Sequence, residues 1–278
     1  MIIHYLYMKE MTTKEIQMVS LEILNEVHEF CVKNNIRYSI AYGTLLGAVR
    51  HKGFIPWDDD VDVLMPRPDW ERFCVTYKSS SKYCLVVPGK DSMIAMARLC
   101  ERDSTIVKTN IIPWCMQETG VWIDIFPLDG AEDDAEEFNK RVNKICSCWR
   151  WNFLVRSSKS PFSRNNGIGK NIKLLIKKLT LFMLHPWKEH DRLLRKHEYG
   201  KYNHVSNLAA PEYKGKEYFL IEDFNNFVKL PFEGREFMAM AGYDRVLRTI
   251  YGDYMQLPPE EKRVAKHPFH EYYWKREK

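Results

Sequence analysis

The chain has 278 residues, of which 45% are hydrophobic, so it can bury a core in one large domain. A formal net charge of +5 suits anionic substrates or a membrane surface but is too small to indicate a nucleic-acid-binding protein. No apolar stretch is long enough to span a bilayer, no signal-peptide pattern is found, and the seven cysteines lack the spacing of a disulfide framework. These features predict a cytoplasmic protein whose membrane contact would be peripheral, at the inner face.

The first predicted element is an amphipathic helix. A capping-box pattern begins at Thr12, and apolar residues then recur at helical spacing from Ile16 to Phe30. Alternating apolar and polar residues over 36–42 predict the first strand, which leads into a Gly-Thr pair.

The Gly-Thr pair, Gly43 and Thr44, precedes a short predicted helix over residues 45–49. A loop at a helix N-terminus offers unpaired N–H groups and the positive end of the helix dipole, which suits a phosphate group. Gly43 and Thr44 are therefore candidate phosphate-binding residues.

Three basic residues follow this helix: Arg50, His51 and Lys52. They can complement the negative end of the helix dipole, or they can bind substrate phosphate. We favour phosphate binding for Arg50, because it lies a few residues from an acidic segment and its guanidinium group matches phosphate geometry. For His51 two roles stay open, phosphate binding and a purely structural role.

The acidic segment is the strongest functional signal. Read as a strand, residues 58–63 place Asp58, Asp60 and Asp62 on one face and Asp59 on the other. Three carboxylates on one face repel one another unless a cation lies between them, and hard oxygen ligands select Mg²⁺ or Mn²⁺. A solvated acidic turn is the alternative, but apolar residues flank the segment on both sides. A phosphate site beside a metal site indicates phosphoryl or nucleotidyl transfer.

A helix is predicted to start at Pro66, and residues 83–108 read as two strands. Arg98 and Arg102 in this region can reach a substrate, but surface positions are the expectation.

The next strand is predicted over residues 121–126. Its alternation places Trp122, Asp124 and Phe126 on one face, so a single carboxylate lies between large apolar side chains and requires an explanation. Asp129 is expected to cap a turn.

The character of the chain changes between residues 140 and 190, where basic residues alternate with aromatic ones. Two interpretations are open: a helix packed on the core with a solvated basic face, which we favour, or an interfacial helix on anionic lipid. The apolar stripe in question consists of Ile168, Ile172, Leu175, Leu179 and Phe182, with lysines around it.

The C-terminal region begins with mixed strand and turn patterns over residues 203–250. The Pro- and Gly-containing block 251–259 is expected to be a rigid surface loop, and Arg263 and His267 after it are candidate substrate contacts.

Four segments together resemble the LicD family, which is similar to the fukutin-related proteins and belongs to the nucleotidyltransferase-fold superfamily. Residues from about 140 to 210 match none of these motifs. The segments that carry the resemblance are Asn34–Tyr38, Tyr42–Met65, Trp122–Asp129 and Tyr251–Pro259.

This resemblance implies an α/β (mixed α+β) nucleotidyltransferase-like fold, in which a small mixed sheet carries the metal carboxylates and helices surround it. It implies a single LicD-like catalytic domain over residues 1–278. The core is expected at about 12–135 and 200–278, with a basic helical elaboration at about 136–199.

The resemblance also implies an activity. A phosphotransferase of this family would take a CDP-alcohol, in the first instance CDP-choline, and move the phospho-alcohol to a sugar hydroxyl of a cell-surface glycan or its lipid-linked precursor, releasing CMP. Lipopolysaccharide, teichoic acid and capsule are the glycans concerned. Asp60, Asp62 and Asp124 would be catalytic, and they would hold Mg²⁺ or Mn²⁺ together with Asp58. Asp124 would ligate the metal or accept the acceptor proton.

Choline recognition requires aromatic faces, and Trp57 and Trp122 lie within two residues of the proposed carboxylates. We therefore expect both to contact substrate. Three alternatives stay open: transfer of ribitol or glycerol phosphate, nucleotidyl transfer from an NTP, and a non-catalytic glycan-binding role.

Overall fold

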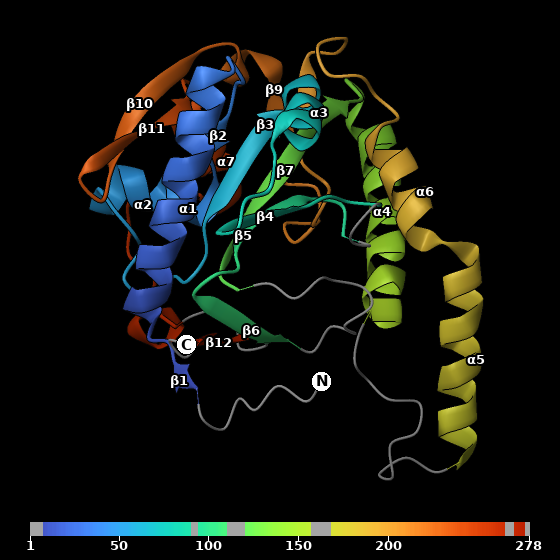
Figure 1. Cartoon of the computed structure of the whole chain (residues 1–278). Coiled ribbons are helices and arrows are strands. Elements are labelled where there is room, and N and C mark those ends of the chain that lie inside the picture. The colour runs from blue at the N-terminus through green and yellow to red at the C-terminus, as the bar shows by residue number, and fades with distance from the viewer. Residues whose placement is uncertain (1–7, 90–93, 110–119, 157–167, 265–269, 276–278) are drawn as a thin grey trace.

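The computed structural model describes residues 8–89, 94–109, 120–156, 168–264 and 270–275 (Figure 1). Within these ranges a mixed sheet forms the centre of the molecule and helices surround it (Figure 1). The mixed α/β class expected from the sequence is therefore confirmed.

The central sheet has seven strands. They are, in order, β2 (Ser39–Ile40), β3 (Asp62–Pro66), β7 (Trp122–Ala131), β5 (Ala97–Glu101) and β4 (Tyr83–Val86), with β8 (His204–Ser206) on β7 and β9 (Phe219–Leu220) on β8. Among these pairs β3 and β7 run parallel, and the others are antiparallel.

Seven α-helices occur in the described part of the chain. They are α1 (Thr13–Lys33), α2 (Tyr42–His51), α3 (Arg67–Thr76), α4 (Ala135–Arg156), α5 (Ile168–Leu184), α6 (Pro186–Leu194) and α7 (Tyr243–Tyr251). Two short 3₁₀ helices are η3 (Ile221–Phe224) and η4 (Glu260–Lys262). A hairpin of β10 (Phe227–Phe232) and β11 (Arg235–Met240) and a small sheet of β1 (Lys9–Glu10), β12 (His270–Trp274) and β6 (Thr105–Thr109) complete the fold.

Helix α1 begins where the sequence predicts. The Glu15 amide donates to the Thr12 hydroxyl at 3.3 Å, and the Thr12 amide donates to the Glu15 carboxylate at 2.8 Å, so the capping box is formed. The helix buries its apolar stripe, including Ile23 and Val27, in the core. It ends before Asn35, whose positive φ of 52° stops the helical backbone.

The two strands predicted beside the candidate site are shorter than expected. Residues 36–42 form only the two-residue β2, because Tyr42 already belongs to the first turn of α2. The prediction that residues 58–63 form a strand is wrong for residues 58–61, since β3 begins at Asp62. The preceding chain turns at Asp58, whose carbonyl accepts a hydrogen bond at 2.8 Å from the Gln17 side chain of α1.

Residues 83–108 contain three strands rather than the two predicted. Strands β4 and β5 join the central sheet, whereas β6 pairs with the distant β12 in the small sheet. A pairing partner more than 150 residues away leaves no local pattern in the sequence.

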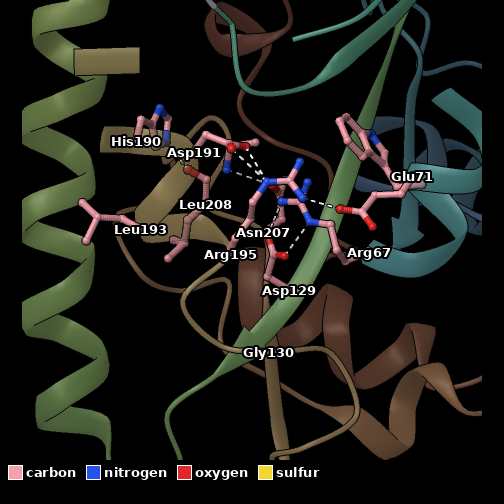
Figure 2. A network of polar contacts seen from close by, with 12 residues as sticks. Arg67, Glu71, Asp129, Gly130, His190, Asp191, Leu193, Arg195, Asn207 and Leu208 are labelled. Carbon is pink, nitrogen blue, oxygen red and sulfur yellow. Dashed lines mark hydrogen bonds and ion pairs between the residues drawn. The ribbon is translucent and has the colours of Figure 1, made fainter. Parts of the chain in front are cut away.

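A buried ion pair joins α3 to β7 (Figure 2). The Arg67 guanidinium donates to both Asp129 carboxylate oxygens, at 2.7 and 2.6 Å, and both side chains are almost fully buried. Arg195, which caps α6, pairs with Asp191 and Glu71 nearby (Figure 2). Asp129 therefore lies inside a strand and binds an arginine, and the expectation that it caps a turn is wrong.

Replacing Asp129 with asparagine is expected to lower the free energy of unfolding by about 3–5 kcal/mol, because the buried Arg67 charge would lose its partner. Chemical denaturation monitored by circular dichroism measures this loss. Glu71→Gln is the matched control, since its pair with Arg195 is about half exposed and should contribute less than about 1 kcal/mol. Equal losses in the two variants would contradict the assignment.

Helix α5 lies at the outer edge of the molecule, with α4 between it and the sheet (Figure 1). The favoured interpretation, in which its apolar stripe packs on the core, is wrong. The stripe residues Ile168, Ile172, Leu179 and Phe182 are between 40% and 80% exposed. Within the described ranges, no helix is both long enough and apolar enough to cross a membrane.

Candidate functional site

Two aspartates face each other across the parallel strands at the centre of the sheet. Asp62 on β3 and Asp124 on β7 are register partners. The pKa of Asp62 is raised well above its ordinary value, first by burial and then by the negative charges of Asp60, Asp124 and Asp58. The strand pairing thus brings together the four carboxylates that the sequence singled out, although Asp58 and Asp60 reach the site from a loop.

Asp124 is held by an arginine. Arg98 on β5 donates from Nε to the Asp124 carboxylate at 2.6 Å, and only 8% of Arg98 is exposed. The Arg98 guanidinium also lies over the Trp122 ring, with 4.5 Å between its central carbon and the ring centroid. The expectation of a surface position for Arg98 is therefore wrong, because the register of β5 on β7 places it directly opposite Asp124.

The Gly-Thr pair lies in the first turn of α2 rather than in a loop before it. A Cβ atom on Gly43 would come within 2.4 Å of Asp58 Oδ2, so the absence of a side chain there makes room for this carboxylate. Its negative charge is favourable at a helix N-terminus. The Thr44 hydroxyl accepts a hydrogen bond from the Asp62 amide at 2.9 Å, which ties α2 to the first residue of β3.

The basic corner at the end of α2 contacts the C-terminal block. The Arg50 guanidinium donates to the Tyr254 carbonyl at 2.8 Å and to the Gln256 carbonyl at 3.4 Å, and its Nε donates to His51. The exposed Lys52 donates to a carbonyl of its own helix and closes α2 in a left-handed conformation. Arg50 therefore anchors the C-terminal segment through these two carbonyls.

Arg263 lies beside Trp57, with its guanidinium 5.8 Å from the ring centroid. Its Nε donates to the Pro258 carbonyl at 2.9 Å. The two residues are more than 200 positions apart, and their contact brings the C-terminal segment next to the loop that carries Asp58. His267, the other C-terminal candidate, lies outside the described residues.

A group of tyrosines beside the carboxylates was not predicted from the sequence. Tyr42 and Tyr213 stack with 5.7 Å between ring centroids, and the Tyr213 and Tyr251 hydroxyls lie 3.0 Å apart. Burial raises the pKa of each of these tyrosines, and the nearby negative charge of Asp62 raises it further. Three segments far apart in the sequence supply the rings, so no local sequence pattern predicts this group of tyrosines.

A buried glutamate supports this group. The Tyr42 hydroxyl donates to Glu217 at 2.5 Å and accepts from the Asn207 side chain at 2.7 Å. These contacts hold Tyr42 at a positive φ of 46°, a conformation that costs a bulky residue about 1–3 kcal/mol. Glu217 and Asn207 lie in or beside the stretch that matches no family motif.

The Glu217 carboxyl is expected to make stability depend on pH. Burial raises its pKa from 4.5 to about 8, so between these values the folded chain retains a proton that the unfolded chain has released. The folded state must therefore lose stability as the pH rises through this interval. Glu217→Gln is neutral at every pH, so its Tm minus that of the unaltered protein should grow from pH 5 to pH 8. Thermal melts in EDTA measure this difference, and parallel pH profiles would contradict the assignment.

The carboxylates suit a divalent cation by their chemistry. Hard carboxylate oxygens bind Mg²⁺ or Mn²⁺, and the negative charge of the partly buried Asp62 among other carboxylates is unfavourable without a cation. Within the described ranges, no three histidine, cysteine, aspartate or glutamate side chains are arranged to hold one metal ion. Asp124 points to Arg98 instead. Metal binding by Asp124 would thus require its side chain to reorient from Arg98.

Comparison with known proteins identifies the family of the chain. The sequence model of the LicD/FKTN/FKRP nucleotidyltransferase domain matches residues 35–165. The chain is 31% identical over 276 residues to the lipopolysaccharide cholinephosphotransferase LicD of Haemophilus influenzae, covering 94% of this chain and 97% of the relative. An uncharacterized protein of Rickettsia prowazekii is 37% identical over 75 residues, which are 23% of this chain and 28% of that protein. With a full-length relative at this level of identity, the chain belongs to the LicD family and is a LicD-like transferase.

Proposed function

We propose that this protein transfers phosphocholine from CDP-choline to a sugar hydroxyl of lipopolysaccharide or its lipid-linked precursor, releasing CMP in the cytoplasm. The name of the Haemophilus relative supports phosphocholine as the group and lipopolysaccharide as the acceptor. The structural observation that carries the proposal is the pairing of Asp62 and Asp124 on adjacent parallel strands, with Asp60 and Asp58 beside them.

Asp60, Asp62 and Asp124 would hold Mg²⁺ or Mn²⁺, with Asp58 as a further ligand. The bound ion would supply charge neutralisation at the donor diphosphate and at the leaving CMP. Most of the rate acceleration in phosphoryl transfer comes from positioning and electrostatics, which rigid strands provide.

The first turn of α2 is the proposed place for the donor phosphates. Its first backbone N–H groups have no carbonyl partner within the helix, and the Asp58 carboxylate beside Gly43 would place the phosphates next to a proposed metal ligand. Arg50, His51, Lys52 and Thr44 remain proposed phosphate contacts.

Asp124 is also the proposed acceptor of the proton from the sugar hydroxyl. Arg98 fixes the orientation of its carboxylate through the 2.6 Å hydrogen bond, leaving the second oxygen available to a metal or a proton. Arg98 is therefore proposed as a positioning residue.

The quaternary ammonium of choline requires aromatic faces that no internal cation already covers. Arg98 lies over Trp122, whereas Tyr213 and Tyr251 are partly exposed beside Asp62. We therefore place the choline group at these tyrosines, with Trp57, Trp122 and Arg263 around the site.

The variant Tyr213→Leu is expected to raise KM for CDP-choline about tenfold, because one cation–π contact contributes on the order of 1 kcal/mol or more. Tyr213→Phe keeps the ring and should change KM little. Trp122→Leu is expected to lower stability by about 3–5 kcal/mol and to leave KM of the folded fraction unchanged. Steady-state kinetics beside thermal melts measure both effects. A rise in KM for Trp122→Leu, with none for Tyr213→Leu, would move choline recognition to Trp122.

The direct test of function is to incubate purified protein and Mg²⁺ with CDP-choline, CDP-ribitol or CDP-glycerol and an acceptor glycan, and to measure CMP. We expect CMP only with CDP-choline. CMP released from CDP-ribitol or CDP-glycerol would show that a different phospho-alcohol is transferred. Pyrophosphate released in a parallel reaction with an NTP would indicate nucleotidyl transfer. Glycan binding without release of either product would indicate a non-catalytic protein.

A further inference from the structure

Helix α5 presents a continuous apolar surface to solvent. Three of its residues on one face, Ile172, Ile176 and Leu179, are 52%, 58% and 55% exposed, and Met183 on the same face is 75% exposed. Residues three, four and seven apart lie on one face of a helix, so these side chains belong to the same apolar stripe as Ile168 and Phe182. Leu181, on another face, is buried. The helix is thus attached along one side and leaves its apolar stripe uncovered within the described part of the chain.

This stripe lies in a segment with an extreme charge. Residues 138–188 contain twelve lysines or arginines and no aspartate or glutamate, whereas the whole chain has a net charge of only +5. The rest of the protein is therefore net negative, and the positive charge is concentrated here. Two lysines of α5, Lys173 and Lys178, border the stripe on its two sides, whereas Lys170 and Lys177 lie nearer the opposite face of the helix.

The neighbouring helix extends the same kind of surface. Trp151 and Phe153 of α4 are 45% and 53% exposed, and they lie on different faces of the helix with the exposed Arg150 between them. In Figure 1, α5 and this end of α4 lie side by side at the edge of the molecule away from the sheet. Exposed tryptophan and phenylalanine beside basic residues are typical of surfaces that enter the interface of a bilayer.

The charges decide between the two occupants that an apolar stripe could have. A second copy of α5 would bring lysines against lysines, with no acidic residue in the segment to pair with them. Anionic phospholipid offers both an apolar layer for the stripe and negatively charged headgroups for the lysines.

We propose that the apolar stripe of α5, with its lysines and the exposed aromatic residues of α4, docks the protein on an anionic membrane surface. The helix lies in the interface plane and does not cross the bilayer. Such docking would hold the catalytic domain near a lipid-linked acceptor, but membrane binding itself does not depend on transfer activity.

Flotation of the full-length protein with vesicles tests this surface. Binding is expected to vesicles of phosphatidylcholine mixed with phosphatidylglycerol, to fall by about tenfold or more on phosphatidylcholine alone, and to weaken as salt rises. The double variant Ile176→Ser/Leu179→Ser should reduce binding to the mixed vesicles about tenfold. The double variant Lys173→Glu/Lys177→Glu should do the same by reversing charge. Val75→Ser is the matched control, because Val75 is 73% exposed on α3 and should not affect binding.

Equal binding by the unaltered protein and both double variants would overturn the proposal, as would no binding at all. A dimer in sedimentation velocity that Ile176→Ser/Leu179→Ser dissociates would instead assign the stripe to a second copy and also overturn it. The serine variant should keep its CMP release with a soluble acceptor, since the changed residues lie outside the carboxylate site. An inactive protein that still binds vesicles through α5 would refute the proposed transfer reaction and leave membrane docking intact.

Discussion

Asp62→Asn is expected to reduce kcat by about a thousandfold or more, corresponding to roughly 4 kcal/mol of lost transition-state stabilisation. The residue is partly buried beside Asp124, and a neutral amide there would hold a divalent cation poorly. Removing the Asp62 carboxylate also affects stability. Because burial and neighbouring charges raise the pKa of Asp62, ionising it in the folded, metal-free protein costs stability, and this cost grows as the pH rises above the ordinary aspartate range. At pH 7 in EDTA the variant should therefore melt at a higher temperature than the unaltered protein.

Addition of Mg²⁺ should raise the Tm of the unaltered protein and leave that of Asp62→Asn unchanged, because only the former binds the ion in its folded state. Asp59→Asn is the matched control. The negative charges that most raise the pKa of Asp62 are those of Asp60, Asp124, Asp58 and Glu212, and the charge of Asp59 is not among them. Loss of activity in Asp59→Asn together with an active Asp62→Asn would refute the assigned carboxylate set.

Asp124→Asn is expected to lower kcat by about 10²–10⁴-fold, since it removes a proton acceptor and a metal ligand while keeping the side-chain shape. The sequence alone suggests that folding survives this change. The structure predicts a further cost of about 3–5 kcal/mol in stability, because the buried Arg98 loses its charge-paired hydrogen bond with Asp124. The contact of Arg98 with Trp122 recovers part of that cost.

The double variant Arg98→Met/Asp124→Asn separates the two effects. Removing both charges should restore much of the lost stability without restoring activity, and denaturation together with CMP release measures this. Arg98→Met alone should reduce kcat through misplacement of Asp124. If Asp124→Asn kept both its stability and its kcat, the residue would lie outside the catalytic site.

The carboxylate site illustrates how far local patterns reach. The sequence singles out Asp58, Asp60, Asp62 and Asp124 because a carboxylate charge next to apolar residues is unfavourable unless a cation or a hydrogen-bonding partner compensates it. It misplaces the first two in a strand, since the Gln17 side chain that binds the Asp58 carbonyl comes from a helix 41 residues away.

Residues brought in from remote elements escape prediction in the same way. Glu217 and Tyr213 have no periodic pattern and no motif around them, yet they border the carboxylates through Tyr42. Arg98 reads as a surface residue until its strand is paired with the strand of Asp124.

The sequence by itself determines helix α1 with its cap, through spacing and through short-range interactions such as the hydrogen bonds between Thr12 and Glu15. It also carries the family signature, whose resemblance implies the mixed α/β class, and it singles out the four candidate carboxylates. Only the tertiary structure decides which side chains surround the carboxylates and which face of α5 is exposed. The physical reason is that an apolar stripe at helical spacing has the same pattern whether a core or a membrane covers it, and that strand register brings together residues from distant parts of the chain.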